Sequence, residues 1–298
     1  MKRVKKPMSR SQKIVFSIAF ILFVLYAIYV LFFFAFGFLI SLKPLEVFKT
    51  DLSIRNPNLL SIPETLDFSA YKRAFSEWGY ELDNGKYVGF FGMLWNSVWR
   101  TFGASFLSWF SSAMVCYILV HYSCKYTRMV YNLGLFVAMI PLYGAGAAQY
   151  KLYDTLHLIN NPLILLTNIT LFSTYFFYMY AFWKSISWSY AEAAMVDGAN
   201  HYQIFFKIMF PMAAPSIIAL FVMTFITGWN DYEGTLLYMK DYPNLPYGVY
   251  IFEELGGRKN DIPMFMSGVL LSLIPILILF LTFQNTIMEK VYLGGLKG

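Results

Sequence analysis

Charged residues are scarce in this sequence of 298 residues: 13% are Asp, Glu, Lys or Arg, whereas 58% are hydrophobic and 20% aromatic. Soluble domains carry about 25% charged residues. The composition therefore excludes an ordinary soluble protein and predicts a polytopic membrane protein. The only two cysteines, Cys116 and Cys124, are too few for a disulfide framework and are expected to be free thiols. The three histidines lack the spacing of metal ligands, so no metal site is predicted.

Catalytic motifs are also missing. The sequence has no H-E-x-x-H and no G-x-S-x-G, which leaves a membrane-bound enzyme without a catalytic constellation. It has no G-x-x-x-x-G-K-[ST], so the chain is not expected to hydrolyse ATP. No long apolar run carries a charge near its middle, where a charge usually marks a proton or ion relay. No pair of similar three-span halves, typical of many secondary transporters, is evident. We predict a protein that is not an enzyme.

Six apolar runs are long enough to cross a membrane, which takes about 20 residues. They are Ile14–Ile40, Thr101–Val120, Val130–Tyr150, Leu163–Trp183, Ala213–Asn230 and Met264–Phe283. The first run is too long for a signal peptide and lacks a small-x-small cleavage site after it, so it is expected to stay as a span. Pro141 and Pro275 are expected to bend the third and sixth spans. The predicted fold class is an all-α polytopic membrane protein with six transmembrane helices.

Positive charge is concentrated on one side of these runs. With the N-terminus inside, the cytoplasmic segments hold 12 basic and three acidic residues, against 11 and 14 outside. The positive-inside rule therefore predicts cytoplasmic N- and C-termini. The chain is divided into a basic N-terminal segment (1–13), a transmembrane domain (14–283) and a cytoplasmic tail (284–298). The domain includes an outer loop (41–92) and a cytoplasmic loop (186–212).

Mild polarity in the fourth run suggests a solute path. Thr167, Thr170, Thr174 and Tyr178 recur at i, i+3, i+7 and i+11, so a continuous helix would place them on one face. Such a stripe could line a path for a hydrophilic solute, or it could hydrogen-bond between packed helices. Both interpretations stay open at this point. The candidates for the translocation path are Asn168, Thr170, Thr174 and Tyr178.

The cytoplasmic loop contains the stretch "SYAEAAMVDGANHYQIFFKIMFPMAAPSI", which carries helix-capping signals. Ser189, with Glu192 three residues later, predicts a capping box, and Gly198 a left-handed helix stop. Asn200 predicts a second N-cap, with a helix to Pro211. The sequence thus predicts two short helices joined at an elbow. The alanine-rich first helix either docks into a groove on another protein or lies on lipid headgroups.

The same loop resembles the EAA loop of bacterial ABC import permeases, with the pattern E-A-A-x3-G-x9-I-x-L-P. The matching residues are Glu192, Ala193, Ala194, Gly198, Ile208 and Pro211, and Phe210 stands where that family usually has Leu. Weaker similarities, "LDFSAYKRAF", "WNS", "WND" and the terminal "GGLKG", follow the order of the carbohydrate-uptake branch, the maltose-type permeases. The resemblance covers nearly the whole chain.

This resemblance implies a permease subunit, in the bacterial cell membrane, of an ATP-driven importer of a sugar or oligosaccharide. The implied partners are a second permease, a dimer of ATP-binding-cassette ATPases and an extracellular solute-binding protein. The ATPases would bind ATP and Mg, and this chain would hold no cofactor. The implied residues for coupling to the ATPase are Glu192, Ala193, Ala194, Asp197, Gly198, Ile208 and Pro211, with both alanines keeping the docking face narrow. The alternative is a channel or an ion-coupled secondary transporter without an ATPase.

Overall fold

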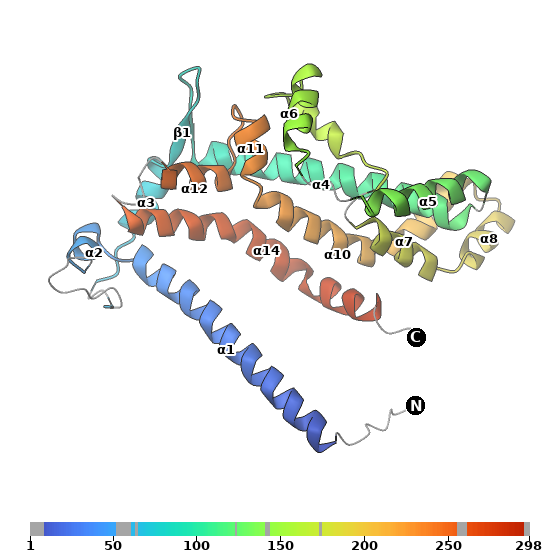
Figure 1. The fold of residues 1–298 in the computed structure, drawn as a ribbon, viewed down its shortest axis with the longest axis horizontal. Helices are drawn as coiled ribbons and strands as arrows, with labels where there is room; N and C mark the ends of the chain where they lie inside the picture. Colours follow the sequence, from blue (N-terminus) through green and yellow to red (C-terminus); the bar gives the residue numbers. More distant parts are fainter. Residues whose placement is uncertain are drawn as a thin grey trace. The chain divides into compact units, whose positions relative to one another are not determined.

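The computed structural model describes residues 9–51, 61–62, 65–122, 124–140, 144–172, 175–254 and 261–294. Within these ranges the chain is mostly helical, as predicted (Figure 1). Two short strands, β1 (Gly79–Glu81) and β2 (Tyr87–Gly89), form an antiparallel hairpin. Four helices in the described ranges are long and apolar enough to cross a membrane: Arg10–Ser41, Phe90–His121, His201–Trp229 and Ile262–Asn285.

The chain forms two compact units. Unit 1 comprises Met1–Ser76 and Phe252–Leu271, and unit 2 comprises Glu77–Ile251 and Ser272–Gly298. Helix α14 (Ile262–Gly294) belongs to both and extends beyond Phe283 into the predicted tail. Pro275 lies inside α14 without interrupting it.

Unit 1 contains α1 (Arg10–Ser41), α2 (Leu45–Asp51) and α3 (Ser69–Ser76). Buried Lys43, which follows α1, donates to Asp51 over 2.9 Å and so ties the start of α2 to its end. On α3, Arg73 forms an ion pair with Asp261 over 2.8 Å. Asp261 also accepts from the Met264 amide over 2.9 Å and caps the beginning of α14. The first pair is therefore local to α2, whereas the second joins α3 to the residue just before α14.

Unit 2 is built around α4 (Phe90–His121), which packs against α10 (Phe210–Trp229), α7 (Phe176–Ser185) and the 3₁₀ helix η1 (Pro162–Asn168). Trp109 on α4 donates its Nε1–H to the Ile217 carbonyl on α10 over 2.9 Å. Gly228 on α10 lies next to α4, since a Cβ there would be in ordinary van der Waals contact, 3.5 Å, with the Thr101 methyl group. The other helices of unit 2 are α5 (Lys125–Ala138), α6 (Gly146–Thr155), α8 (Ser189–Val196), α9 (His201–Gln203), the π-helical η2 (Ile204–Met209), α11 (Glu233–Tyr238) and α12 (Leu245–Glu254).

The third and fourth apolar runs do not form the continuous helices predicted over Val130–Tyr150 and Leu163–Trp183. In the third, α5 ends at Ala138 and α6 begins at Gly146; Pro141 between them lies outside the described residues. A proline disfavours helical geometry in the residue before it, which agrees with a helix end at this point. In the fourth, η1 gives way to non-helical backbone before α7. The number of membrane crossings therefore stays a prediction.

Candidate functional site

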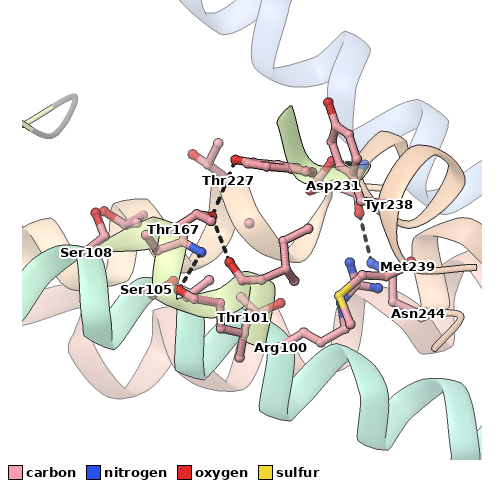
Figure 2. Close-up of a pocket in the computed structure, with 18 of the residues that line it drawn as sticks. Arg100, Thr101, Ser105, Ser108, Thr167, Thr227, Asp231, Tyr238, Met239 and Asn244 are labelled. Atoms are coloured by element: carbon pink, nitrogen blue, oxygen red, sulfur yellow. Dashed lines mark hydrogen bonds between the residues drawn. The ribbon is translucent and has the colours of Figure 1, made fainter. Parts of the chain in front are cut away.

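A polar cavity of about 420 Å³ lies within unit 2 (Figure 2). Its walls come from α4, α6, η1, α10 and the segment that follows α10. The polar side chains that line it are Arg100, Thr101, Ser105, Ser108, Gln149, Tyr153, Thr167, Asn168, Tyr175, Thr224, Thr227, Asp231, Tyr238 and Asn244. Hydroxyls, amides and tyrosines thus outnumber charged groups.

One wall of the cavity is a row of hydroxyls on α4. Thr101, Ser105 and Ser108 lie at i, i+4 and i+7, so one helix face presents all three (Figure 2). Across the cavity, Thr224 and Thr227 on α10 donate their hydroxyls to the carbonyls of their own helix four residues back, over 3.0 and 3.1 Å. Each of these two oxygens keeps lone pairs that can accept a hydrogen bond from a solute.

A second wall is aromatic. Gln149 on α6 donates to the Tyr153 hydroxyl over 2.9 Å, and that hydroxyl lies 3.4 Å from Thr167 Oγ1. The rings of Tyr153 and Tyr238 meet edge to face with centroids 5.1 Å apart. Burial raises the pKa of Tyr238, and Tyr153 and Asp231 nearby add to this, so its phenol stays a neutral hydrogen-bond donor at physiological pH.

The two charged residues of the cavity hold the segment that follows α10. Arg100 on α4 donates through Nη1 to Thr235 Oγ1 over 2.6 Å and to the Tyr242 carbonyl over 3.0 Å. Asp231 accepts from the Gly234 amide over 2.8 Å, and Asn244 donates to the Asp231 carbonyl over 2.8 Å. Arg100, together with Asn96 and Ser97, therefore links α4 to this segment, which closes one side of the cavity.

The structure describes three of the four predicted path residues and places them in different surroundings. Asn168 lines the cavity, with its Nδ2 donating to the Leu165 carbonyl over 3.1 Å. Thr170 is not in its lining and pairs through its amide with Ser111, and Tyr178 is 63% exposed away from it. Thr174 lies outside the described residues. The separate prediction that Thr167, Thr170, Thr174 and Tyr178 share one helix face is wrong, because the described backbone after η1 is not helical and α7 begins only at Phe176.

Sequence reasoning missed two groups of cavity residues. The first is the row of hydroxyls on α4, and the second is the pair of charged residues, Arg100 and Asp231. The i, i+4, i+7 spacing of Thr101, Ser105 and Ser108 was the available signal for the first. No local signal pairs Arg100 with Thr235, because the two residues lie 135 positions apart in the sequence.

The second feature of unit 2 is the helical elbow that α8 and α9 form. Helix α8 ends in a Schellman motif: the Gly198 amide donates to the Met195 carbonyl over 3.0 Å and the Ala199 amide to the Ala194 carbonyl over 2.9 Å. Gly198 has φ 83°, which confirms the predicted left-handed stop. Asn200 and Gln203 form the predicted second capping box, each side chain accepting from the other's amide over 2.9 Å.

Two details of the elbow differ from the prediction. Ser189 is not the N-cap, because α8 already begins at Ser189 and its hydroxyl pairs with Ser187 over 2.8 Å; Glu192 still lies in the first turn. The second helix does not end at Pro211. It runs from His201 to Trp229 through η2, and Pro211 lies at the beginning of α10. A π turn just before a proline relieves the clash of its ring with the preceding turn.

The two alanines of the E-A-A triplet have different environments. Ala194 is 7% exposed and packs into the core of unit 2 with Ala191, Trp183 and Ile204. The expectation that both alanines shape an outward face is therefore wrong for Ala194. The exposed residues of α8 and its C-cap are Ser189, Tyr190, Glu192, Ala193, Met195, Val196 and Asp197. Of the remaining predicted coupling residues, Ile208 is half-buried against the same core and Pro211 is exposed.

Comparisons with known proteins identify relatives of the chain. No model of a described protein family matches the chain. The arabinooligosaccharides transport system permease protein AraQ of Halalkalibacterium halodurans is 30% identical over 253 residues, covering 84% of this chain and 86% of the relative. The sulfoquinovosyl glycerol transport system permease protein SmoH of Agrobacterium fabrum is 23% identical over 254 residues, covering 84% and 85%.

The structural comparison gives the same fold. A bacterial ABC transporter involved in the import of the acidic polysaccharide alginate matches with a TM-score of 0.70 and 22% identity, covering 94% of this chain and 99% of that chain. The chain is thus a multi-pass bacterial membrane protein of the permease class. It belongs to the permease subunits of carbohydrate-uptake ABC transporters, which confirms the resemblance found in the sequence.

Proposed function

We propose that this chain is the translocation subunit of an ATP-driven importer, and that its polar cavity forms part of the path of a sugar or oligosaccharide into the cytoplasm. The observation that carries the proposal is the lining of the cavity, where hydroxyls face tyrosine rings across a space of about 420 Å³. A sugar presents hydroxyls that donate and accept, and C–H faces that pack on aromatic rings.

A path must hold its solute weakly enough to release it, and the cavity chemistry suits this. Thr224 and Thr227 already donate to their own helix, so each offers a solute mainly acceptor positions. Such bonds to neutral groups replace bonds to water and contribute only about 0.5–1.5 kcal/mol each. The solute would therefore be oriented without being trapped. Selectivity among sugars would depend on the shape of the cavity, which the hydrogen bonds of Arg100 and the ring of Tyr153 determine.

The elbow is the proposed contact with the ATPase. Exposed Glu192, Ala193 and Asp197 lie on α8 and its cap, and Ala194 anchors the helix in the core. From the elbow, one continuous helix runs from His201 to Trp229 and carries Thr224 and Thr227 into the cavity wall. At about 1.5 Å per residue, this helix is about 40 Å long. A displacement of the elbow by the ATPase would be transmitted along it to the cavity.

The remaining partners and the orientation follow from the same proposal. A second permease would complete the path, and an extracellular solute-binding protein would deliver the sugar. The ATPase dimer would bind ATP and Mg, which leaves this chain without a cofactor. Both termini would lie in the cytoplasm, on the same side as the elbow, as the distribution of Lys and Arg predicts.

Uptake into vesicles tests the proposal, using the chain assembled with the subunits encoded beside its gene. Thr227→Val removes a cavity hydroxyl with little change of volume. Thr282→Val removes a hydroxyl that also donates to its own helix but lies outside the cavity lining. We expect Thr227→Val to change sugar uptake several-fold at unchanged assembly, and Thr282→Val to leave it unchanged.

Two results would contradict the proposal. If both variants take up sugar at the same rate, the cavity is not part of the translocation path. Uptake driven by an ion gradient, without ATP or an ATPase subunit, would favour the alternative of a channel or an ion-coupled secondary transporter.

A further inference from the structure

A second cavity, of about 550 Å³, lies in unit 2 where α4 ends and α5 begins. Its lining includes Lys125, Thr127 and Arg128 of α5, Tyr131 one turn further on, and Tyr180 of α7. We call it the basic cavity. Figure 1 shows that α5, α7 and α8 lie around the same end of α4, so the basic cavity and the elbow share one end of this unit.

The basic cavity has positive charge without a counter-charge. Lys125 and Arg128 are three residues apart on α5, so their side chains leave the helix on neighbouring positions. Both are exposed, and no acidic residue lines the cavity. None of the ion pairs between described residues involves either side chain. Two cations that face one cavity repel each other, so an anion bound between them would be stabilised by both.

The position of the cavity points to a lipid. It includes Leu119 and Val120, in the last turn of α4, which is long and apolar enough to cross a membrane. The cavity therefore lies at the level where a membrane-spanning helix leaves the hydrocarbon region. Tyr131 and Tyr180 form an aromatic wall with ring centroids 4.6 Å apart. Tyrosines are enriched at the depth of lipid headgroups, and basic cavities between helices there hold anionic headgroups.

We propose that the basic cavity binds the headgroup of an anionic phospholipid. The phosphate would lie between Lys125 and Arg128, where charge-assisted hydrogen bonds form, and the polar headgroup would rest against the two tyrosines. A lipid phosphate is held at this depth by its acyl chains, so its local concentration far exceeds that of a soluble phosphate.

A bound headgroup would also brace the end of α4 on which the elbow rests. Tyr122 directly follows α4 and pairs through its hydroxyl with His201 Nδ1 over 2.9 Å. Tyr117, one turn earlier, packs on Phe205 with ring centroids 4.7 Å apart. Anionic lipid would thus stabilise the contact between α4 and the helix that carries the elbow.

Lipid retention by the full-length chain in its purified assembly tests the proposal. The assembly is exchanged into detergent with phosphatidylglycerol or phosphatidylcholine, and bound lipids are counted by native mass spectrometry. Each Lys or Arg near a membrane surface changes affinity for anionic lipid about fivefold, so the K125Q/R128Q variant should bind phosphatidylglycerol about 30-fold more weakly. The control K184Q removes an exposed charge from the last turn of α7, outside the cavity lining, and should retain the lipid.

Further controls distinguish a lipid site from a soluble-anion site and from a general effect of charge. Phosphatidylcholine should bind equally weakly to the unchanged chain and the double variant. Inorganic phosphate should not displace phosphatidylglycerol at millimolar concentration; if it does, the site binds a soluble anion and the proposal fails. Equal loss in K184Q and K125Q/R128Q would show a general charge effect and would also overturn it. If the double variant does not assemble, R128Q alone should show the fivefold loss.

Discussion

The backbone conformation of Gly198 leads to the sharpest prediction. Its φ of 83° lies in the left-handed region, and a Cβ added there would meet no atom within 4 Å. Gly198→Ala therefore introduces no clash, and its only cost is the left-handed conformation, about 1–2 kcal/mol for a residue with a side chain. That energy lowers the population of the native elbow relative to alternatives by about 5- to 30-fold.

Gly85 provides a matched control. It turns the β1–β2 hairpin with φ 78°, and a Cβ there also meets nothing within 4 Å. Gly85→Ala should thus cost a similar energy, far from the elbow in sequence. Gly198→Asn should recover much of the loss, because Asn tolerates the left-handed region better than Ala. The assay is ATP-driven sugar uptake in vesicles, together with the amount of ATPase subunit that co-purifies.

We expect Gly198→Ala to reduce both uptake and co-purification, Gly198→Asn to restore part of both, and Gly85→Ala to leave co-purification unchanged. If Gly85→Ala and Gly198→Ala reduce uptake and co-purification equally, the effect is one of general stability, and the elbow has no special part in coupling. If Gly198→Ala changes nothing, the left-handed stop is not needed for the contact.

Three further predictions concern stability, each measured by thermal unfolding in detergent. Ile204→Ala should cost about 2–5 kcal/mol, because the side chain is fully buried behind the elbow; an unchanged midpoint would contradict this packing. Asn244→Leu should cost about 1–3 kcal/mol, because it leaves two backbone partners of the buried amide without a hydrogen bond; a melting point equal to that of the unchanged chain would refute it. Asp51 has a lowered pKa, through its hydrogen bonds from Ser61 and Lys43 and the Lys43 charge, so its stabilising contribution is full above the ordinary pKa and is lost as pH falls through the lowered one. The melting temperature of Asp51→Asn should therefore fall less steeply than that of the unchanged chain as the pH is lowered below the ordinary pKa of 3.8, and identical slopes would exclude this contribution.

Short-range signals in the sequence were reliable where partners lie within a few residues. The Asn200 capping box and the Gly198 stop depend on groups three to five positions apart, so the pattern alone specifies them. Ser189 shows the limit of this rule: its hydroxyl pairs with that of Ser187, and α8 begins at Ser189 itself, with Trp188 in the N-cap position.

Four of the six apolar runs lie in helices long enough to cross a membrane, but hydropathy did not predict the backbone of the third and fourth runs. It counts composition over about 20 residues and does not register that the run from Leu163 to Trp183 leaves helical geometry between η1 and α7. The residues that line the cavity could be predicted only in part, and the reason is different. Arg100 meets Thr235, and Ser105 approaches Gly228, only after α4 and α10 have packed, and no pattern within one run records that contact.

The π-helical segment η2 affects the direction in which the side chains of the following helix, α10, point around its axis. A π turn takes one residue more than an α turn, which rotates every later side chain by about 100° around the axis. The nine residues between Gly198 and Ile208 include most of this segment. Deleting one residue from Ile204–Met209 would preserve hydropathy, yet it would turn Thr224 and Thr227 away from the cavity or twist the elbow by the same angle. A single-residue deletion in this helix would therefore rotate the residues that follow it. The number of residues between the elbow and Thr224 thus determines which side chains face the cavity.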